Sequence, residues 1–189
     1  MMIDQFSDLT DSQLASQYAW TQDVRSRINL VIDSQGLLAG PDGTSQSLTS
    51  KNDRTLLHRI RRGADAVVVG ANSVRKEGWH IPSESALVVI SHGTLDELPF
   101  CPAPERVHVF GFTGAVEYLE SVENWVCEGG QTVVQTMLTL DLVDELCLTF
   151  LDSLTQELPA WITQSSHKRF VQVSAIQDGR HVFTRWRRG

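Results

Sequence analysis

Continuous apolar runs and helically spaced apolar sets alternate along most of this chain. The continuous runs are short, which is typical of strands buried on both faces of a sheet. They cover residues 26–33, 64–70, 86–90, 106–110 and 142–150. Apolar residues spaced three or four positions apart predict helices between these runs, at residues 54–62 and 115–121 and after Gly130. The alternation predicts a three-layer α/β/α domain with a mostly parallel sheet.

The N-terminal segment differs from this pattern. Residues 1–23 are expected to form an appendage with a short helix capped by Asp11 or Ser12. We expect the appendage to pack against the main body or against a partner subunit. Residues 24–189 are expected to form a single domain.

The end of the chain predicts antiparallel strands. Residues 151–168 have the composition of a polar connection. The strand-like segments 169–176 and 179–188 then flank Asp178-Gly179, a dipeptide that favours a tight hairpin turn. We therefore expect a C-terminal hairpin at one side of the sheet.

A long polar loop follows the first predicted strand. Residues 34–53 contain three glycines and one proline and show no helical or strand periodicity. Loops of this length in compact domains are either functional or disordered. Its position directly after a core strand favours a functional loop, and Asp53 is expected to cap the helix that follows.

Two strand ends lead through glycine into a helix. In the stretch from Trp125 to Leu140 a short strand is followed by Glu128, Gly129 and Gly130 and then by helical periodicity. A helix start leaves backbone N–H groups free, and these groups bind anions well. A similar junction follows Gly70, where Ser73 is a candidate cap. The alternative is that the glycines only form tight turns.

Composition excludes several classes of function. The net charge of −7 argues against nucleic acid as a partner. The three cysteines, Cys101, Cys127 and Cys147, are far apart and fit no metal or redox spacing. No apolar run approaches the roughly 20 residues that span a bilayer, and the acidic N-terminus does not resemble a signal peptide. We expect a soluble cytoplasmic protein without a metal.

A set of short motifs occurs in a fixed order between residues 24 and 188. It comprises Asn29-Leu-Val with Gly36, Asp42-Gly-Thr-Ser45, Leu48-Thr49, Asp53-Arg54, Leu57-His-Arg-Ile-Arg61, Ala64-Asp-Ala-Val-Val-Val-Gly70-Ala-Asn-Ser-Val-Arg75, Glu77-Gly-Trp79, Glu128-Gly-Gly130, Leu142-Val-Asp-Glu-Leu146 and Asp178-Gly179. In this order the motifs resemble the reductase domain of bacterial riboflavin biosynthesis, the RibD C-terminal-like domain. The resemblance implies the dihydrofolate reductase-like fold.

The resemblance also implies an activity. The implied activity is that of an NADPH-dependent oxidoreductase that acts on a pyrimidine-type small molecule. The family reaction is reduction of the ribosyl C1′ of 5-amino-6-(5-phosphoribosylamino)uracil to the ribityl form. Two alternatives stay open. One is a degenerate member that binds nucleotide without turnover, as a sensor or partner subunit. The other is a domain that binds no nucleotide. A homodimer is also expected, since two-fold dimers are the commonest assembly, with residues 171–176 and the appendage as candidate surfaces.

Residues are assigned to the site by their position in the resemblance. The catalytic candidates are Asp33, Gln35 and Glu128, the last of which would face the pyrimidine. The substrate-binding candidates are Asn29, Ser45, Thr49, Arg54 and Arg61. The candidates for holding the NADPH phosphates are Gly70, Ala71, Asn72, Ser73, Gly129, Gly130, Gln131 and Thr132, with Ser91 and His92 at the 2′-phosphate.

The chain departs from the family pattern after its first strand. The family usually carries Asp-Gly there, whereas here Gln35 precedes Gly36 and the nearest acid is Asp33. A shift of two residues keeps a side chain on the same face of a strand but displaces it by about 6–7 Å. In the glycine turn at Gly70, Asn72 adds bulk where a phosphate would approach the backbone. Both departures motivate the degenerate alternative.

Overall fold

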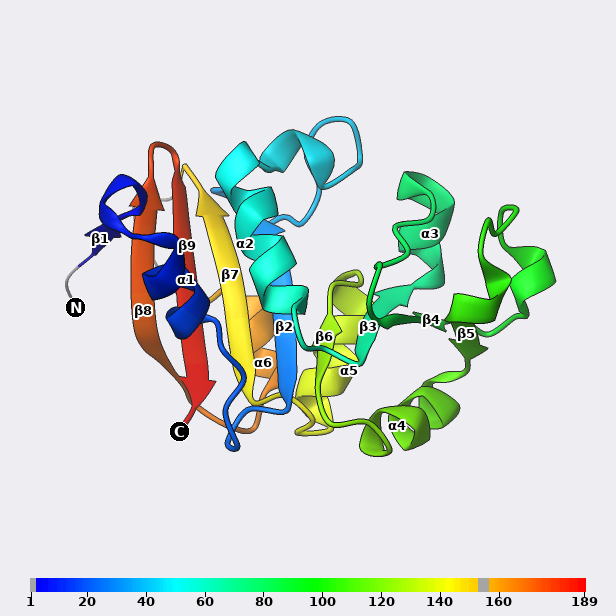
Figure 1. Ribbon diagram of the computed structural model, residues 1–189. Coiled ribbons are helices and arrows are strands. Elements are labelled where there is room, and N and C mark those ends of the chain that lie inside the picture. The colour runs from blue at the N-terminus through cyan, green and yellow to red at the C-terminus, as the bar shows by residue number, and fades with distance from the viewer. Residues whose placement is uncertain (1–2, 153–156) are drawn as a thin grey trace.

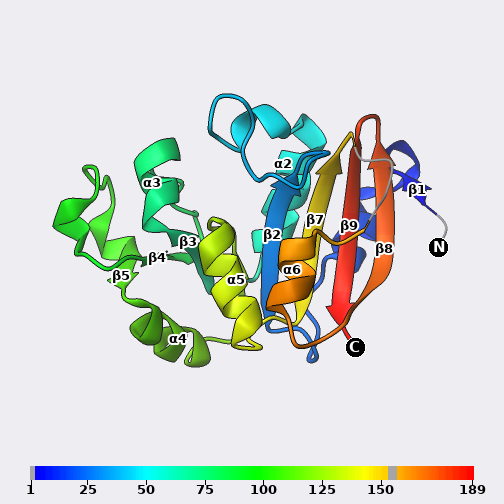
Figure 2. The same cartoon turned by 180° about the vertical axis from the view of Figure 1, so that it is seen from behind.

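The computed structural model describes residues 3–152 and 157–189, which form a sheet with helices on both faces (Figures 1 and 2). Its strands are β1 (Asp4–Gln5), β2 (Ser26–Ile32), β3 (Ala66–Gly70), β4 (Ala86–Ile90), β5 (Val107–Phe110), β6 (Trp125–Cys127), β7 (Glu145–Leu151), β8 (Phe170–Asp178) and β9 (His181–Arg188). Its α-helices are α1 (Asp11–Gln17), α2 (Lys51–Arg61), α3 (Ala71–Glu77), α4 (Phe112–Glu120), α5 (Gln131–Thr139) and α6 (Ala160–Ser165).

The strands of the described residues pair in the order β1-β8-β9-β7-β2-β6-β3-β4-β5. Neighbouring strands are parallel, except that β9 runs antiparallel to both β7 and β8. The predicted fold class is confirmed: the sheet is mostly parallel and ends in a C-terminal antiparallel hairpin. Among the described residues, no helix has both the length and the apolar character needed to cross a bilayer.

Buried apolar side chains hold the helices on the two faces. On one face, α5 and α6 contribute the fully buried Met137 and Ile162 to a large core cluster. On the opposite face, α1 and α2 pack over the sheet through Leu14 and Leu56. Val74 of α3 packs in a third cluster over β3 and β4. Each predicted amphipathic helix thus buries one apolar stripe, as its spacing requires.

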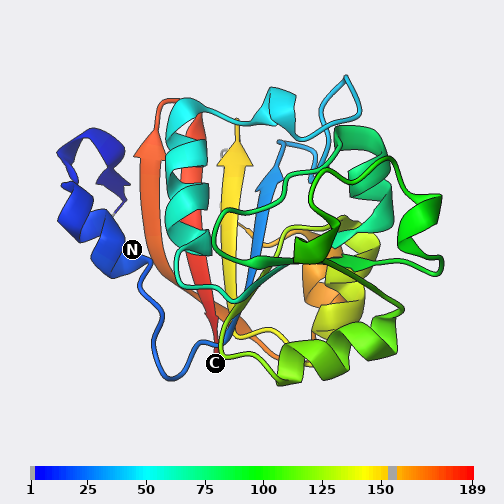
Figure 3. The ribbon, with the colours of Figure 1, turned by 45° about the vertical axis from the view of Figure 1, so that its right-hand side comes forward.

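The N-terminal segment lies beyond β8 (Figure 3) and is tied to the main body. β1 extends the sheet by pairing with the end of β8. The fully buried Arg27 of β2 donates to the carbonyl oxygens of Tyr18 and Ala19 and to the carboxylate of Glu145. Its guanidinium also lies 4.0 Å from the ring centroid of Trp20. These contacts satisfy a charge that would otherwise be costly to bury.

Two predicted helix caps are wrong. The cap of α1 is Thr10, which forms a capping box with Gln13, and neither Asp11 nor Ser12 takes that role. The cap of α2 is Ser50, whose hydroxyl accepts from the backbone N–H of Asp53. Because Asp53 lies one turn inside the helix, its carboxylate is available for other contacts.

Other helix boundaries also differ from the prediction. α3 starts directly after Gly70, so Ser73 lies inside the helix and is not its cap. α4 begins at Phe112, three residues earlier than expected. α6 was missed, because Trp161 and Ile162 are the only large apolar residues of a six-residue helix within a polar stretch. A helix this short shows too little periodicity to be recognised.

Candidate active site

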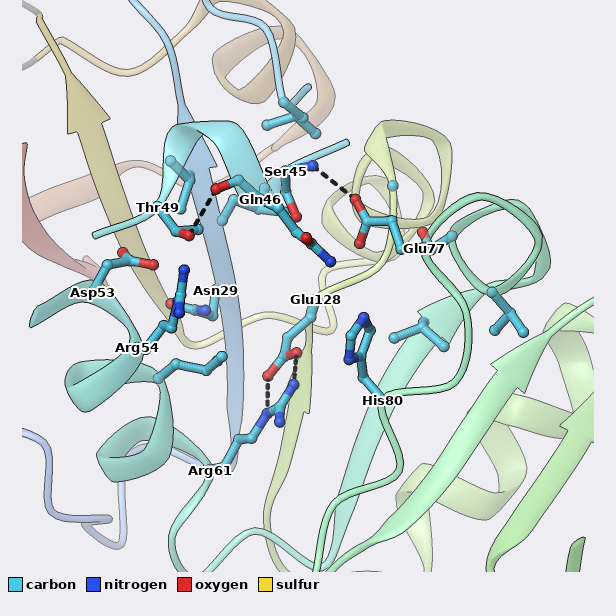
Figure 4. A pocket seen from close by; sticks show the side chains of 18 of the residues that line it. Asn29, Ser45, Gln46, Thr49, Asp53, Arg54, Arg61, Glu77, His80 and Glu128 are labelled. Atoms are coloured by element: carbon cyan, nitrogen blue, oxygen red, sulfur yellow. Dashed lines mark hydrogen bonds and ion pairs between the residues drawn. The ribbon is translucent and has the colours of Figure 1, made fainter. Parts of the chain in front are cut away.

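A cavity of about 480 Å³ opens at the carboxyl ends of β2, β3 and β6 (Figure 4). Its volume lies in the range of small-molecule sites, about 300–1,000 Å³. The polar or charged residues in its wall are Asn29 of β2, Ser45, Gln46 and Thr49 of the loop after β2, Asp53, Arg54 and Arg61 of α2, Ser73 and Glu77 of α3, His80, and Glu128 after β6. Parallel strands place ligands at this edge of a sheet.

The fold brings together many of the residues assigned by resemblance. All the substrate-binding candidates line the cavity, namely Asn29, Ser45, Thr49, Arg54 and Arg61. Glu128 lines it as well, as do Ser73 and Gly130 from the two glycine turns. Side chains separated by up to a hundred positions in sequence therefore face one space.

Asp33 and Gln35 lie elsewhere in the described structure, outside the cavity wall. The carboxylate of Asp33 accepts from the backbone N–H groups of Gln35 and Leu37, each at 2.8 Å. The indole N–H of Trp161 donates to the carbonyl oxygen of the adjacent Gly36 at 3.3 Å. Asp33 thus shapes the turn that starts the long loop.

Glu128 forms a two-bond ion pair with Arg61 inside the cavity. Nε of Arg61 donates to Oε1 of Glu128 at 2.7 Å, and Nη2 donates to Oε2 at 2.5 Å. Burial acts to lower the pKa of Arg61, but the hydrogen bonds and charge of Glu128 raise it above its ordinary value. Arg61 therefore stays charged, and its two hydrogen bonds hold the side chain of Glu128 in place.

Asp53 is the acid that sequence reasoning missed. Its side chain lines the cavity, is 8% exposed and accepts a hydrogen bond from the hydroxyl of Thr149 at 2.7 Å. Burial raises its pKa above the ordinary value, and the Thr149 hydrogen bond and the charges of His181 and Arg54 offset this only in part. The sequence did contain a signal for this role. Ser50, three residues before Asp53, is the better helix cap, and capping by Ser50 leaves the carboxylate of Asp53 available for the cavity.

The two glycine turns lie against each other. A Cβ atom on Gly129 would lie 2.4 Å from the backbone nitrogen of Gly70, so this glycine is required for the turns to touch. A Cβ on Gly130 would meet only the hydroxyl of Ser73, at 4.0 Å. Neither α3 nor α5 has a side-chain cap on its N-terminal N–H groups. The open side of the paired turns therefore presents uncapped donors and space beside Gly130.

The remaining cofactor candidates surround these turns. Gln131 and Thr132 are exposed in the first turn of α5, and Ala71 is buried at the start of α3. The side-chain oxygen of Asn72 accepts from Arg75 at 3.2 Å. Farther from the cavity, after β4, His92 is exposed and the buried hydroxyl of Ser91 accepts from the N–H of Gly93 at 3.0 Å.

Comparison with known proteins identifies the family that this site resembles. Residues 29–105 match the RibD C-terminal domain family. The resemblance drawn from the sequence motifs is thereby confirmed over this segment, which carries the long loop, α2 and the first glycine turn. No curated protein sequence matched the chain significantly. The described residues contain no group of three or more His, Cys, Asp or Glu that could hold a metal ion.

Solved structures extend the likeness in fold to most of the chain. A pyrimidine reductase-like protein from Corynebacterium diphtheriae is 20% identical, with a TM-score of 0.71 over 96% of this chain and 99% of that one. Dihydrofolate reductase from Enterococcus faecalis, complexed with NADP(H), is 16% identical, with a TM-score of 0.64 over 90% and 99%. A deaminase/5-amino-6-(5-phosphoribosylamino)uracil reductase from Thermotoga maritima is 17% identical, with a TM-score of 0.64 over 88% of this chain and 57% of its own length. The chain has the dihydrofolate reductase-like fold.

Proposed function

We propose that this chain is an NADPH-dependent reductase that transfers a hydride to a pyrimidine-type substrate. The most specific reaction that we propose is reduction of the ribosyl C1′ of 5-amino-6-(5-phosphoribosylamino)uracil to the ribityl form. The observation that carries the proposal is the joint position of two uncapped glycine turns and a polar wall around one cavity. The match of residues 29–105 to the reductase family supports the same activity.

The residues present fit a dinucleotide. The starts of α3 and α5 offer backbone N–H groups without side-chain caps, and such groups bind phosphate. Gly130 leaves space beside Ser73, where a phosphate can reach the backbone. Gly70 to Ser73 and Gly129 to Thr132 would hold the phosphates, with Ser91 and His92 toward the adenosine end. NADPH, when bound, would supply the hydride.

The chain's own residues would bind the substrate and provide a proton. The overall reduction adds a hydride to C1′ and a proton to the ribose ring oxygen, whose bond to C1′ breaks. Asp53 is suited to provide that proton, because burial raises its pKa and it faces the cavity. Arg54 makes no side-chain hydrogen bond or ion pair within the described residues and extends along the cavity wall beside Asn29 (Figure 4), where it would bind the substrate phosphate.

A second candidate is a nucleotide-binding protein without turnover, acting as a sensor or partner subunit. The observation that favours it is the position of the acids first assigned to catalysis. Asp33 is bonded within a turn, and Glu128 is paired with Arg61. In this reading the cavity would bind the nucleotide without turnover.

Two measurements test the proposal. A thermal shift titration with NADPH and NADH should show stabilisation by NADPH that NADH does not match, and about 100 times the Kd should add about 2.7 kcal/mol. NADPH oxidation with the phosphoribosylamino-uracil should then show turnover. Arg54→Gln should raise the KM for this substrate, whereas Arg62→Gln, at an exposed position that ends the same helix, should not. Binding of NADPH without turnover would favour the second candidate, and no binding would exclude both.

A further inference from the structure

One hydrogen bond joins the two walls of the cavity mouth. The backbone N–H of Ser45, in the loop after β2, donates to Oε1 of Glu77 at 2.8 Å. Glu77 is the last residue of α3, so the bond crosses from the loop wall to the wall that carries the first glycine turn (Figure 4). A charged acceptor makes this bond stronger than an ordinary neutral one.

The tip of the loop is ordered internally. The carboxylate of Asp42 accepts from the N–H and the hydroxyl of Thr44 and from the hydroxyl of Ser47, at 2.9–3.0 Å. These hydrogen bonds hold the pKa of Asp42 below its ordinary value. Asp42 therefore connects Thr44 and Ser47 within the tip of the loop.

The loop is anchored at both ends but held at its tip by Glu77. At one end the indole of Trp161 donates to Gly36, and at the other the imidazole of His181 contacts the carbonyl oxygen of Leu48 at 3.0 Å. Between these anchors, and within the described residues, the hydrogen bond from Ser45 to Glu77 is the one that connects residues 38–47 to a segment outside the loop. Removing the carboxylate takes away this connection, while the partly buried Leu38 still packs against the core.

We propose that Glu77 is a positioning residue that latches the loop over the cavity and keeps Ser45, Gln46 and Thr49 in its wall. Because Glu77 ends the helix that begins at the first glycine turn, the latch joins the substrate wall to the cofactor wall. The consequence for substrate binding rests on the proposed function, whereas the order of the loop does not depend on it.

Hydrogen exchange at the Ser45 amide tests the latch directly. Glu77→Ala should speed exchange of this amide by about ten- to hundredfold, the loss expected for a hydrogen bond to a charged group. Glu77→Gln keeps an acceptor oxygen and should restore most of the protection. Glu117→Ala, at an exposed position of α4, is the matched control and should leave the amide unchanged. Unchanged exchange in Glu77→Ala, with the fold confirmed by circular dichroism, would overturn the latch.

Steady-state kinetics then test its role in the site. Loosening the loop should raise the substrate KM more than it lowers kcat, with Glu77→Gln between the wild type and Glu77→Ala. NADPH affinity measured by titration should stay within about twofold, since Glu77 lies at the far end of α3 from the glycine turn. Faster exchange with unaltered KM would refute the role in substrate binding. Absence of turnover in every variant, including the wild type, would refute the proposed function and leave the exchange result standing.

Discussion

The hydroxyl of Thr149 on β7 donates to the carboxylate of Asp53 on α2 at 2.7 Å, at the wall of the cavity. The bond fixes the direction of the acid, while burial raises its pKa above the ordinary value. A strand and a helix separated by almost a hundred residues thus position the carboxyl group that we propose as the proton donor. This pair leads to the first two predictions.

Asp53→Asn should lower kcat by about 10²–10⁴-fold, the usual contribution of a positioned general acid. In the wild type, kcat should fall as the pH rises through the raised pKa of Asp53, because only the protonated acid donates. Asp53→Asn should lose this dependence and retain NADPH affinity. A pH profile of kcat checks the prediction, and a variant with wild-type turnover would remove Asp53 from the mechanism.

The same carboxyl makes stability depend on pH. Folded Asp53 holds its proton more tightly than the unfolded chain, so its contribution to stability is full below the unfolded pKa and is lost as the pH rises through the folded pKa. Asparagine stays uncharged throughout. The Tm of Asp53→Asn relative to the wild type should therefore increase as the pH rises from the ordinary pKa of an aspartate through the raised pKa of Asp53. A constant difference across this range would show that burial does not raise this pKa.

The adjacent glycines should respond differently to substitution. Gly129→Ala puts a Cβ against the backbone of Gly70 and should cost about 1–3 kcal/mol of unfolding free energy. Gly130→Ala adds a Cβ that meets only the hydroxyl of Ser73, at 4.0 Å, so its stability should stay within about 0.5 kcal/mol while NADPH binds more weakly. Urea unfolding and nucleotide titration of both variants separate packing from binding. Equal NADPH affinity in Gly130→Ala and the wild type would argue against a phosphate at this turn.

The buried carboxylate of Glu145 should be essential for stability. It accepts from the fully buried Arg27 and also from Arg185 and Arg187. Glu145→Ala leaves these cations without their partner and should cost about 3–5 kcal/mol in urea unfolding. Glu120→Ala, on the exposed face of α4, serves as a control and should change stability by less than about 0.5 kcal/mol. A small loss in the first variant would mean that water replaces the carboxylate.

We propose that two copies of the chain associate through the first half of β8. β1 pairs with this strand only near its end, at Ile176 and Gln177, while Val171 and Val173 are 49% and 44% exposed. Apolar side chains on a strand edge favour pairing with another strand. Val171→Lys with Val173→Lys should yield a monomer in sedimentation, and Leu140→Lys, at the exposed residue that follows α5, should not. A monomeric wild type would contradict this assembly.

The sequence predicted the sheet well because its strands are continuous apolar runs, and such runs depend little on their partners. Contacts within the site were harder to predict. Ser50 and Asp53 both suit a helix cap, and only the start of the helix at Lys51 decides between them. Asp33 carries the carboxyl group that a catalytic acid needs, yet this carboxylate accepts hydrogen bonds within a turn. The bond between Glu77 and Ser45 joins distant segments, and local spacing carries no signal for it.

The position of β9 between β7 and β8 has a consequence for folding during synthesis. The chain makes β7 and β8 first, yet the two strands have no shared edge until β9 fills the gap. A nascent chain therefore exposes two unpaired strand edges until β9 emerges from the ribosome, and such edges are prone to aggregate. Closure of this half of the sheet is expected to be a late, all-or-none step, and slow passage through it would favour chaperone binding.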